Sequence, residues 1–151
     1  MVLLSRSPLS RVEILPSDGP PVIIADTMVA GKSLHVVAAH PVPPIYGQAS
    51  QRRNRMIQTL ARHLATCPRP FVLLGDLNNT PWSPSLSPLP PSARNTRRGF
   101  GLLPSWPKLL PLPLRIPIDQ CYVSEEVGVV QCQLGPDVGS DHFPLVVDVQ
   151  L

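Results

Sequence analysis

Two short segments, far apart in the chain, contain the side chains whose types and spacing could do chemistry. Residues 71–78 read Phe-Val-Leu-Leu-Gly-Asp-Leu-Asn, and residues 139–142 read Gly-Ser-Asp-His. An apolar run that stops at Gly-Asp-Leu-Asn is typical of a buried strand that carries two oxygen-bearing side chains, Asp76 and Asn78, at its end. Carboxylate and amide oxygens suit a hard divalent cation, and an imidazole beside a carboxylate, as in Asp141-His142, can move a proton. The two segments together predict metal-assisted hydrolysis.

The elements around these segments predict an α/β protein with layered sheets and one solid helix. Apolar residues recur at helical spacing over residues 48–65, where Ser50 is expected to cap the helix. Pro144 indicates an edge position or a strand start for the last strand. No GxGxxG motif occurs, which argues against a dinucleotide-binding fold. The expected strands are residues 2–4, 12–15, 22–25, 33–39, 71–78, 116–119, 121–123, 127–134 and 143–149, with a helical turn at 82–86.

The composition is that of a globular chain. Its 151 residues are 43% hydrophobic and 15% charged, which predicts a single domain over residues 1–151. Many of the 21 prolines lie within residues 81–117, so this stretch is expected to be a long, ordered and irregular loop. The net charge of +3 favours anionic partners only mildly.

The remaining sequence signals concern the compartment. Cys67, Cys121 and Cys132 are odd in number and lack metal-ligand spacing, which predicts reduced, mostly buried thiols. No apolar run is long enough for a transmembrane segment or a signal-peptide core, so the cytoplasm is the default expectation.

Five motifs in one order give the chain a family resemblance. The three most informative are Gly-Asp-Leu-Asn at 75–78, Pro-Ile-Asp-Gln at 117–120 and Gly-Ser-Asp-His at 139–142. Ala-His-Pro at 39–41 and Leu-Leu-Ser-Arg-Ser-Pro at 3–8 complete the set. In order and rough spacing the set resembles the endonuclease/exonuclease/phosphatase superfamily, also called DNase I-like, over nearly the whole chain. The resemblance implies a partial α/β/β/α sandwich with a mixed, mostly antiparallel sheet.

The resemblance also implies roles for individual residues. Asp76, Asn78 and Asp141 would bind Mg²⁺ or Mn²⁺, and Asn78 would also bind the scissile phosphate. His142 would be the acid/base imidazole, held in one tautomer by Asp119. His40 would donate to a phosphate oxygen or to the leaving group. The expected catalytic set is therefore His40, Asp76, Asn78, Asp119 and His142. Gln120 stands where the family has a histidine.

Each residue also has a simpler interpretation. Asp76 and Asp141 could be turn-formers, and His40 and His142 could be satisfied histidines at strand ends. The preserved order of the set favours the site. The solvated face of the helix is expected to carry Arg52, Arg53, Arg55 and Arg62. In the long loop, Arg97, Arg98 and Trp106 are expected to face either the substrate or plain solvent. Trp82 is expected to pack beneath the metal loop.

One departure from the family shapes the functional prediction. Only the C-terminal portion of the domain is matched, and the N-terminal half that supplies a metal-binding Glu in relatives is absent, since neither Glu13 nor Asp26 takes its place. The chain is expected to start in mid-domain and to cover its exposed apolar sheet by forming a homodimer. The leading function is a metal-dependent phosphodiesterase, most simply a DNA endonuclease. The alternatives are a phosphatase or phospholipid phosphodiesterase with the same site, and an inactive half-domain that only dimerises.

Overall fold

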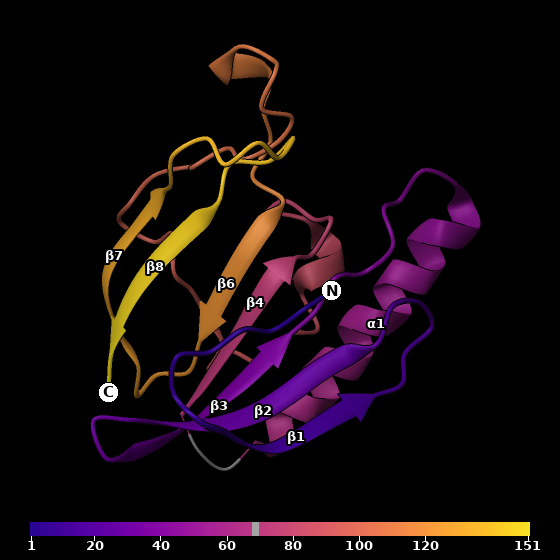
Figure 1. Cartoon of the computed structure of the whole chain (residues 1–151). Helices are drawn as coiled ribbons and strands as arrows, with labels where there is room; N and C mark the ends of the chain where they lie inside the picture. Colours follow the sequence, from indigo (N-terminus) through magenta and orange to yellow (C-terminus); the bar gives the residue numbers. More distant parts are fainter. Residues whose placement is uncertain (68–69) are drawn as a thin grey trace.

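The computed structural model describes residues 1–67 and 70–151, which form two β-sheets and one long helix (Figure 1). The larger sheet has the strand order β1-β2-β3-β4-β6-β5, and β7 and β8 form a second, two-stranded sheet. The elements are β1 (Leu9–Leu15), β2 (Val22–Val29), β3 (Lys32–Ala38), α1 (Gly47–Thr66), β4 (Phe71–Asp76), the 3₁₀ turn η1 (Pro84–Leu86), β5 (Arg94–Asn95), the 3₁₀ turn η2 (Leu112–Leu114), β6 (Asp119–Val123), β7 (Gly128–Leu134) and β8 (Leu145–Gln150).

The larger sheet is mixed because the chain crosses over once. The strand pair β3–β4 is parallel and is connected through α1, whereas β1–β2, β2–β3, β4–β6 and β5–β6 are antiparallel. The predicted mixed, mostly antiparallel sheet with one main helix is therefore confirmed. Parallel strands end at the same edge of a sheet, so the segments after β3 and β4 meet there.

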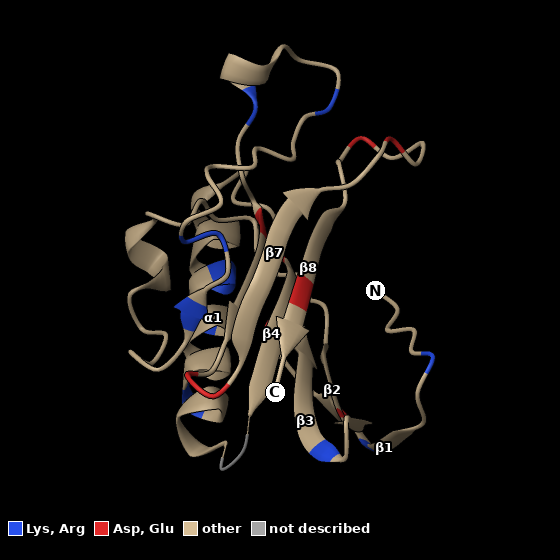
Figure 2. Cartoon of the chain, turned by 90° about the vertical axis from the view of Figure 1, so that its left-hand side faces the viewer, with Lys and Arg blue, Asp and Glu red and all other residues tan. Residues whose placement is uncertain are grey.

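The two faces of the larger sheet are covered by different layers. On one face the apolar stripe of α1, including Met56, Ile57 and Leu60, packs against residues such as Val37 and Leu73. On the other face a second apolar cluster joins this sheet to β7 and β8, through residues such as Val72, Val123 and Val147. Arg residues cluster on α1, whereas the charged residues of the strands are scattered (Figure 2). The result is a helix–sheet–sheet sandwich.

Most predicted elements are confirmed, and the exceptions have local causes. The strand expected at residues 2–4 is wrong: the first strand is β1, and residues 5–7 form a bend in which Ser7 N–H donates to Ser5 Oγ at 3.2 Å. Ile116 forms only an isolated bridge with Trp106, so the strand expected at 116–119 is replaced by β6, which begins at Asp119. The expected cap Ser50 lies inside α1, whose N-cap is Tyr46 without a side-chain cap bond. Helical periodicity located this helix but not its first residue.

The loop over residues 81–117 is irregular, as predicted, and contains only η1, β5 and η2. The buried thiols are also confirmed for Cys121 and Cys132, and burial raises the pKa of Cys121 to about 12. Among the described residues no helix is both long and apolar enough to cross a membrane.

Gly75, in β4, permits a close approach between β3 and β4 just before the strand ends. Its φ is +142°, and a Cβ at this position would lie 2.0 Å from the carbonyl oxygen of Ala39. The backbone bond from Ala39 N–H to the Leu74 carbonyl, 3.0 Å long, is made at the same place. A side chain at position 75 would therefore separate the two strands at the edge where their polar residues meet.

We expect Gly75→Ala to lower the free energy of unfolding by about 3 kcal/mol or more, since strain in φ and a backbone clash act together. The control is Gly31→Ala, because Gly31 also has a positive φ, +80°, but nothing lies within 4 Å of its Cβ position. That variant should lose only about 1 kcal/mol. Urea unfolding of both variants measures the difference, and equal losses would contradict the close-approach argument.

Candidate active site

The register between β4 and β6 places two carboxylates side by side at the edge of the larger sheet. Asp76, the last residue of β4, is paired with Asp119, the first residue of β6. His142 comes from the loop before β8. Ligand atoms of Asp76, Asp119 and His142 all lie within 4.8 Å of one another. Residues separated by more than sixty positions along the chain thus form one compact polar group.

The closest contact in this group joins His142 to Asp119. His142 Nδ1 lies 2.8 Å from Asp119 Oδ2, and both side chains are partly buried. A carboxylate accepts the Nδ1–H of a neutral imidazole, which leaves Nε2 as the nitrogen with a lone pair. This is the predicted arrangement in which Asp119 sets the tautomer of His142.

Asn78, expected within the strand over residues 71–78, lies instead in a tight turn, because β4 ends at Asp76. Asp76 Oδ1 accepts the backbone N–H of Asn78 at 2.8 Å, and Asn78 has a positive φ of 49°. The Asn78 side-chain amide donates to the Pro41 carbonyl at 2.9 Å. His40 Nε2 lies 3.6 Å from Asp76 Oδ2. The turn therefore ties the end of β4 to the segment that follows β3.

These side chains open into a cavity of about 530 Å³. Its polar lining consists of His40, Asp76, Asn78 and His142, which are four of the five predicted catalytic residues. The fifth residue, Asp119, is hydrogen-bonded to His142 but does not line the cavity. The remaining lining is mostly apolar and comprises Pro43, Pro44, Ile45, Trp106, Ile116 and Ile118. Such a wall excludes water beside the polar group, which strengthens the electrostatic interactions there.

Asp141, predicted as a metal ligand, lies apart from the group. Its exposed carboxylate accepts a bond from Trp106 Nε1 at 3.2 Å, and this bond holds the pKa of Asp141 below its usual range. The ring of Trp106 lies 6.1 Å from that of His142. Within the described residues the cluster that could hold a cation contains Asp76, Asp119 and His142 rather than Asp141.

The proline-rich loop holds the segment that carries His142. Lys108 N–H donates to the Asp141 carbonyl at 2.8 Å, and Phe143 N–H donates to the Ser105 carbonyl at 2.9 Å. Lys108 also pairs with Asp137, with Nζ and Oδ1 2.7 Å apart. These contacts on both sides of His142 fix its position relative to the sheet.

Two buried polar residues, Gln120 and Arg97, support the site by donating to backbone carbonyls. The sequence analysis did not predict this structural role. The buried Gln120 amide donates to the carbonyls of Asn79 and Pro117, at 2.9 and 2.6 Å. Arg97, expected at the surface, is only 5% exposed, and its guanidinium donates to the carbonyls of Leu102, Leu103 and Asp119. Both satisfy backbone carbonyls of the start of β6 and of the loops beside it. The signal available in the sequence was a long polar side chain within or beside an apolar strand.

Two further expectations about surface residues are corrected. Trp82 is 62% exposed instead of being packed beneath the turn. Arg53 is half-buried, and its guanidinium donates to the Asn78 carbonyl at 3.2 Å, so it supports the turn after β4. Its neighbours Arg52 and Arg55 are exposed, as predicted, and pair with Asp18.

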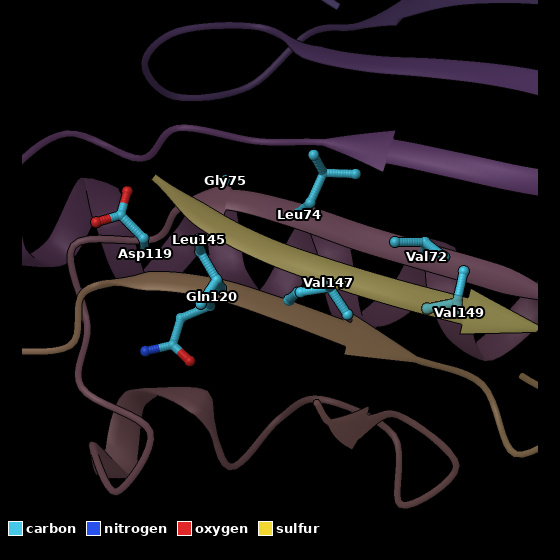
Figure 3. A pocket seen from close by; sticks show the side chains of 9 residues that line it. Val72, Leu74, Gly75, Asp119, Gln120, Leu145, Val147 and Val149 are labelled. Carbon is cyan, nitrogen blue, oxygen red and sulfur yellow. The ribbon is translucent and has the colours of Figure 1, made fainter. Parts of the chain in front are cut away.

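A second cavity, of about 320 Å³, lies between the two sheets (Figure 3). Its apolar walls are side chains of β4 and β8, including Val72, Leu74 and Val147. Strand β6 contributes Asp119, Gln120 and Cys121, with Asp119 at one end. The two sheets thus diverge near the polar group and leave an apolar groove beside it.

Burial and charge have a clear effect on Asp76. Burial raises the pKa of the Asp76 carboxyl, and the charge of Asp119 raises it further, against opposing effects of the Asn78 N–H, His40 and His142. Two adjacent carboxylates in a partly buried site repel each other and are stabilised by a cation. The donor set of two carboxylates and one imidazole suits Mg²⁺, Mn²⁺ or a similar divalent ion.

The comparisons with known proteins agree with this geometry. A family model described as "Endonuclease/Exonuclease/phosphatase family" matches residues 1–142. A search of the curated proteins returned no match. The solved structure of D. rerio TDP2 complexed with single strand DNA product has a TM-score of 0.76 at 17% identity, covering 95% of this chain and 68% of that chain.

Two bacterial structures show the same likeness. An endonuclease/exonuclease/phosphatase from Beutenbergia cavernae has a TM-score of 0.75 at 22% identity, covering 97% of this chain and 46% of that chain. The mannosyl-6-phosphatase Bt3783 of Bacteroides thetaiotaomicron has a TM-score of 0.59 at 17% identity, covering 87% of this chain and 58% of that chain. At these identities the likeness shows the fold alone, and it confirms the predicted DNase I-like class.

The raised pKa of Asp76 predicts a change in thermal stability that can be measured without an activity assay. Ionised Asp76 destabilises the metal-free fold, and this penalty is present above the folded-state pKa and is lost as the pH falls below it. We therefore expect Asp76→Asn to raise the melting temperature by a few degrees in EDTA near neutral pH, with the difference shrinking in mild acid. The control Asp148→Asn changes an exposed Asp and should leave the melting temperature unchanged. A lower melting temperature for Asp76→Asn at neutral pH would refute the argument.

Proposed function

The chain belongs to the endonuclease/exonuclease/phosphatase family, and on that premise we propose that it is a divalent-metal-dependent phosphodiester hydrolase that cleaves DNA. The observation that carries the proposal is the convergence of Asp76, Asp119 and His142 at one edge of the larger sheet. His40 and Asn78 line the same cavity. The arrangement provides negative charge for a cation, an imidazole for proton transfer and polar hydrogens for a phosphate.

In this proposal Asp76 holds Mg²⁺ or Mn²⁺ together with the amide oxygen of Asn78, and the negative charge of the nearby Asp119 favours the cation without ligating it. When bound, the cation polarises the phosphate and stabilises the leaving oxygen. Asp141 lies outside the group of Asp76, Asp119 and His142, so its predicted role as a ligand requires its loop to shift. The partly buried carboxylates support a cation here, because their mutual repulsion needs a positive charge.

The proton chemistry is assigned to His142 and Asp119. With Nδ1 bonded to Asp119, His142 directs its other ring nitrogen to receive a proton from the attacking water, and the carboxylate stabilises the imidazolium that forms. His40, 49% exposed at its side chain and 3.6 Å from Asp76, is placed to donate to a phosphate oxygen or the leaving group. The remaining amide hydrogen of Asn78 can bind the phosphate.

DNA is the preferred substrate because the fold neighbour TDP2 was crystallised with a single strand DNA product, and the net charge of +3 favours a polyanion. A phospholipid or another phosphoester is the second candidate. It is favoured by the projecting turn around η2, where Leu109, Leu112 and Leu114 are each at least 60% exposed (Figure 1). A substrate panel of plasmid DNA, RNA, a phosphodiester dye and lipid vesicles distinguishes these candidates.

The proposed assembly is a homodimer that fills the apolar groove between the sheets. β8 pairs with β7 on one side only, so its other edge can pair with the same edge of a second copy about a twofold axis. The apolar walls of the groove are side chains of β4 and β8 (Figure 3).

We expect the protein to nick supercoiled plasmid in Mg²⁺ or Mn²⁺ and to lose this activity in EDTA. Asp76→Ala and His142→Ala should each reduce the rate by roughly 10²–10⁴-fold, the range for a general base or a metal ligand. Asp148→Asn is the control and should retain the rate. Full activity in both alanine variants would mean that the nicking comes from another protein, and no cleavage of any substrate in the panel would favour an inactive, dimerising domain.

A double-mutant cycle tests how Asp119 acts. If Asp119 works through His142, Asp119→Asn should reduce the rate by roughly 10²-fold in the wild type and very little in the His142→Ala background. The concentration of Mg²⁺ that gives half of the maximal rate should stay unchanged. A large rise in that concentration would instead make Asp119 primarily a metal ligand.

The homodimer is tested by sedimentation velocity on the wild type and two matched variants. Val147 lines the groove, whereas the adjacent Val146 does not. Val147→Lys should therefore shift the dimer to a monomer, and Val146→Lys should not. Because Val147 also packs in the apolar cluster between the sheets, circular dichroism must show that the Val147→Lys variant remains folded. A wild-type protein that sediments as a compact monomer at all concentrations would contradict the dimer.

A further inference from the structure

A second cluster of polar side chains lies in the helix-covered half of the molecule, at the edge of the sheet opposite to the proposed active site. It comprises Asp26 of β2, His35 of β3 and His63 of α1. His35 is paired across the antiparallel ladder with Asp26 and across the parallel ladder with Phe71, the first residue of β4. The active-site residues follow the other ends of β3 and β4, so the phosphodiesterase mechanism does not use this cluster.

The cluster has the geometry of an oriented ligand pair. His35 Nδ1 lies 2.6 Å from Asp26 Oδ1, and both residues are buried, with 4% and 7% exposure. On the other side of the ring, His35 Nε2 lies 2.8 Å from His63 Nε2. The two imidazole rings are stacked, with centroids 5.1 Å apart and planes inclined by 28°. The Nε2 atoms of His35 in β3 and His63 in α1 thus face each other at hydrogen-bond distance.

Proton positions follow from these contacts. The carboxylate of Asp26 accepts the Nδ1–H of His35, so a neutral His35 presents a lone pair at Nε2. At 2.8 Å the facing Nε2 of His63 donates its proton to this lone pair, and the other neutral tautomer of His63 frees its Nε2 as a second ligand atom. A carboxylate that orients the histidine from behind is the arrangement found behind metal-bound histidines, where it fixes the tautomer and increases the ligand's basicity.

We propose that His35 and His63 form a binding site for a borderline transition-metal ion such as Zn²⁺, with Asp26 as the positioning residue. Imidazole nitrogen suits Zn²⁺, Cu²⁺ or Ni²⁺, whereas Mg²⁺ prefers oxygen ligands. Zn–N bonds of about 2.0–2.1 Å require the two Nε2 atoms to separate slightly from their present distance. His63 can make that movement because it lies half-buried in the last turn of α1.

The bound ion would replace the shared proton and join the last turn of α1 to β3, with water completing its coordination. Since an ion that binds only the folded state stabilises it, its effect on the fold is measurable without any substrate. Glu13 on β1 is near enough to raise the pKa of His63, against the lowering effects of burial, His35 and Arg11. The surroundings of the His63 ring therefore include one anionic side chain and one cationic side chain of β1.

The experiment must separate this site from the proposed active site, which also contains histidine. His142→Gln removes the active-site imidazole, and excess Mg²⁺ is present throughout to occupy carboxylate sites. In that background, Zn²⁺ is titrated by calorimetry and by thermal unfolding, with and without the second substitution His63→Gln. We expect His142→Gln to bind one Zn²⁺ with a rise in melting temperature. The double variant should bind at least tenfold more weakly and show no such rise.

A second measurement covers the case in which the double variant is itself altered in fold. In the wild type, the ring resonances of both His35 and His63 should shift on addition of one equivalent of Zn²⁺ in excess Mg²⁺. Unchanged His35 and His63 resonances, or equal Zn²⁺ affinity with and without His63, would overturn the proposal. Neither outcome depends on whether the protein hydrolyses phosphodiesters, so the two proposals can fail separately.

Discussion

The antiparallel register of β4 with β6 is the constraint on which the proposed site depends. It places Asp76 opposite Asp119, and the parallel pairing of β3 with β4 brings His40 to the same edge. A slip of one residue would turn one carboxylate to the other face of the sheet, because side chains alternate along a strand. Gly75 makes this arrangement possible, since a Cβ there would collide with the backbone of β3.

The same arrangement puts like charges in a partly buried place, which opposes folding and favours a cation. Burial and Asp119 raise the pKa of Asp76, whereas the Asn78 N–H and two histidines lower it. A local loss of stability of this kind is common where a protein must bind charge. Contacts around the site offset this loss. Arg97 and Gln120 donate to backbone carbonyls near the site, and the proline-rich loop makes backbone hydrogen bonds on both sides of His142.

Helix α1 connects the two polar clusters of the molecule. Near its start, Arg53 supports the turn that contains Asn78, and in its last turn His63 meets His35. Between these points its apolar stripe packs against the larger sheet (Figure 1). The helix therefore aligns one edge of the sheet with the other, and an ion that fixed its last turn would restrain a helix whose first half supports the proposed active site.

The sequence alone determined the fold class and most elements, because periodicity, proline and glycine act on neighbouring residues, but it did not predict the turn that takes Asn78 out of the strand. It also located His142 and Asp119 as candidates through motif order. Only the tertiary structure decided that Asp141 contacts Trp106, that Arg97 is buried and that His35 meets His63. These outcomes depend on which carbonyls and side chains the loops bring together, and local sequence patterns contain no information about contacts between residues that are distant along the chain.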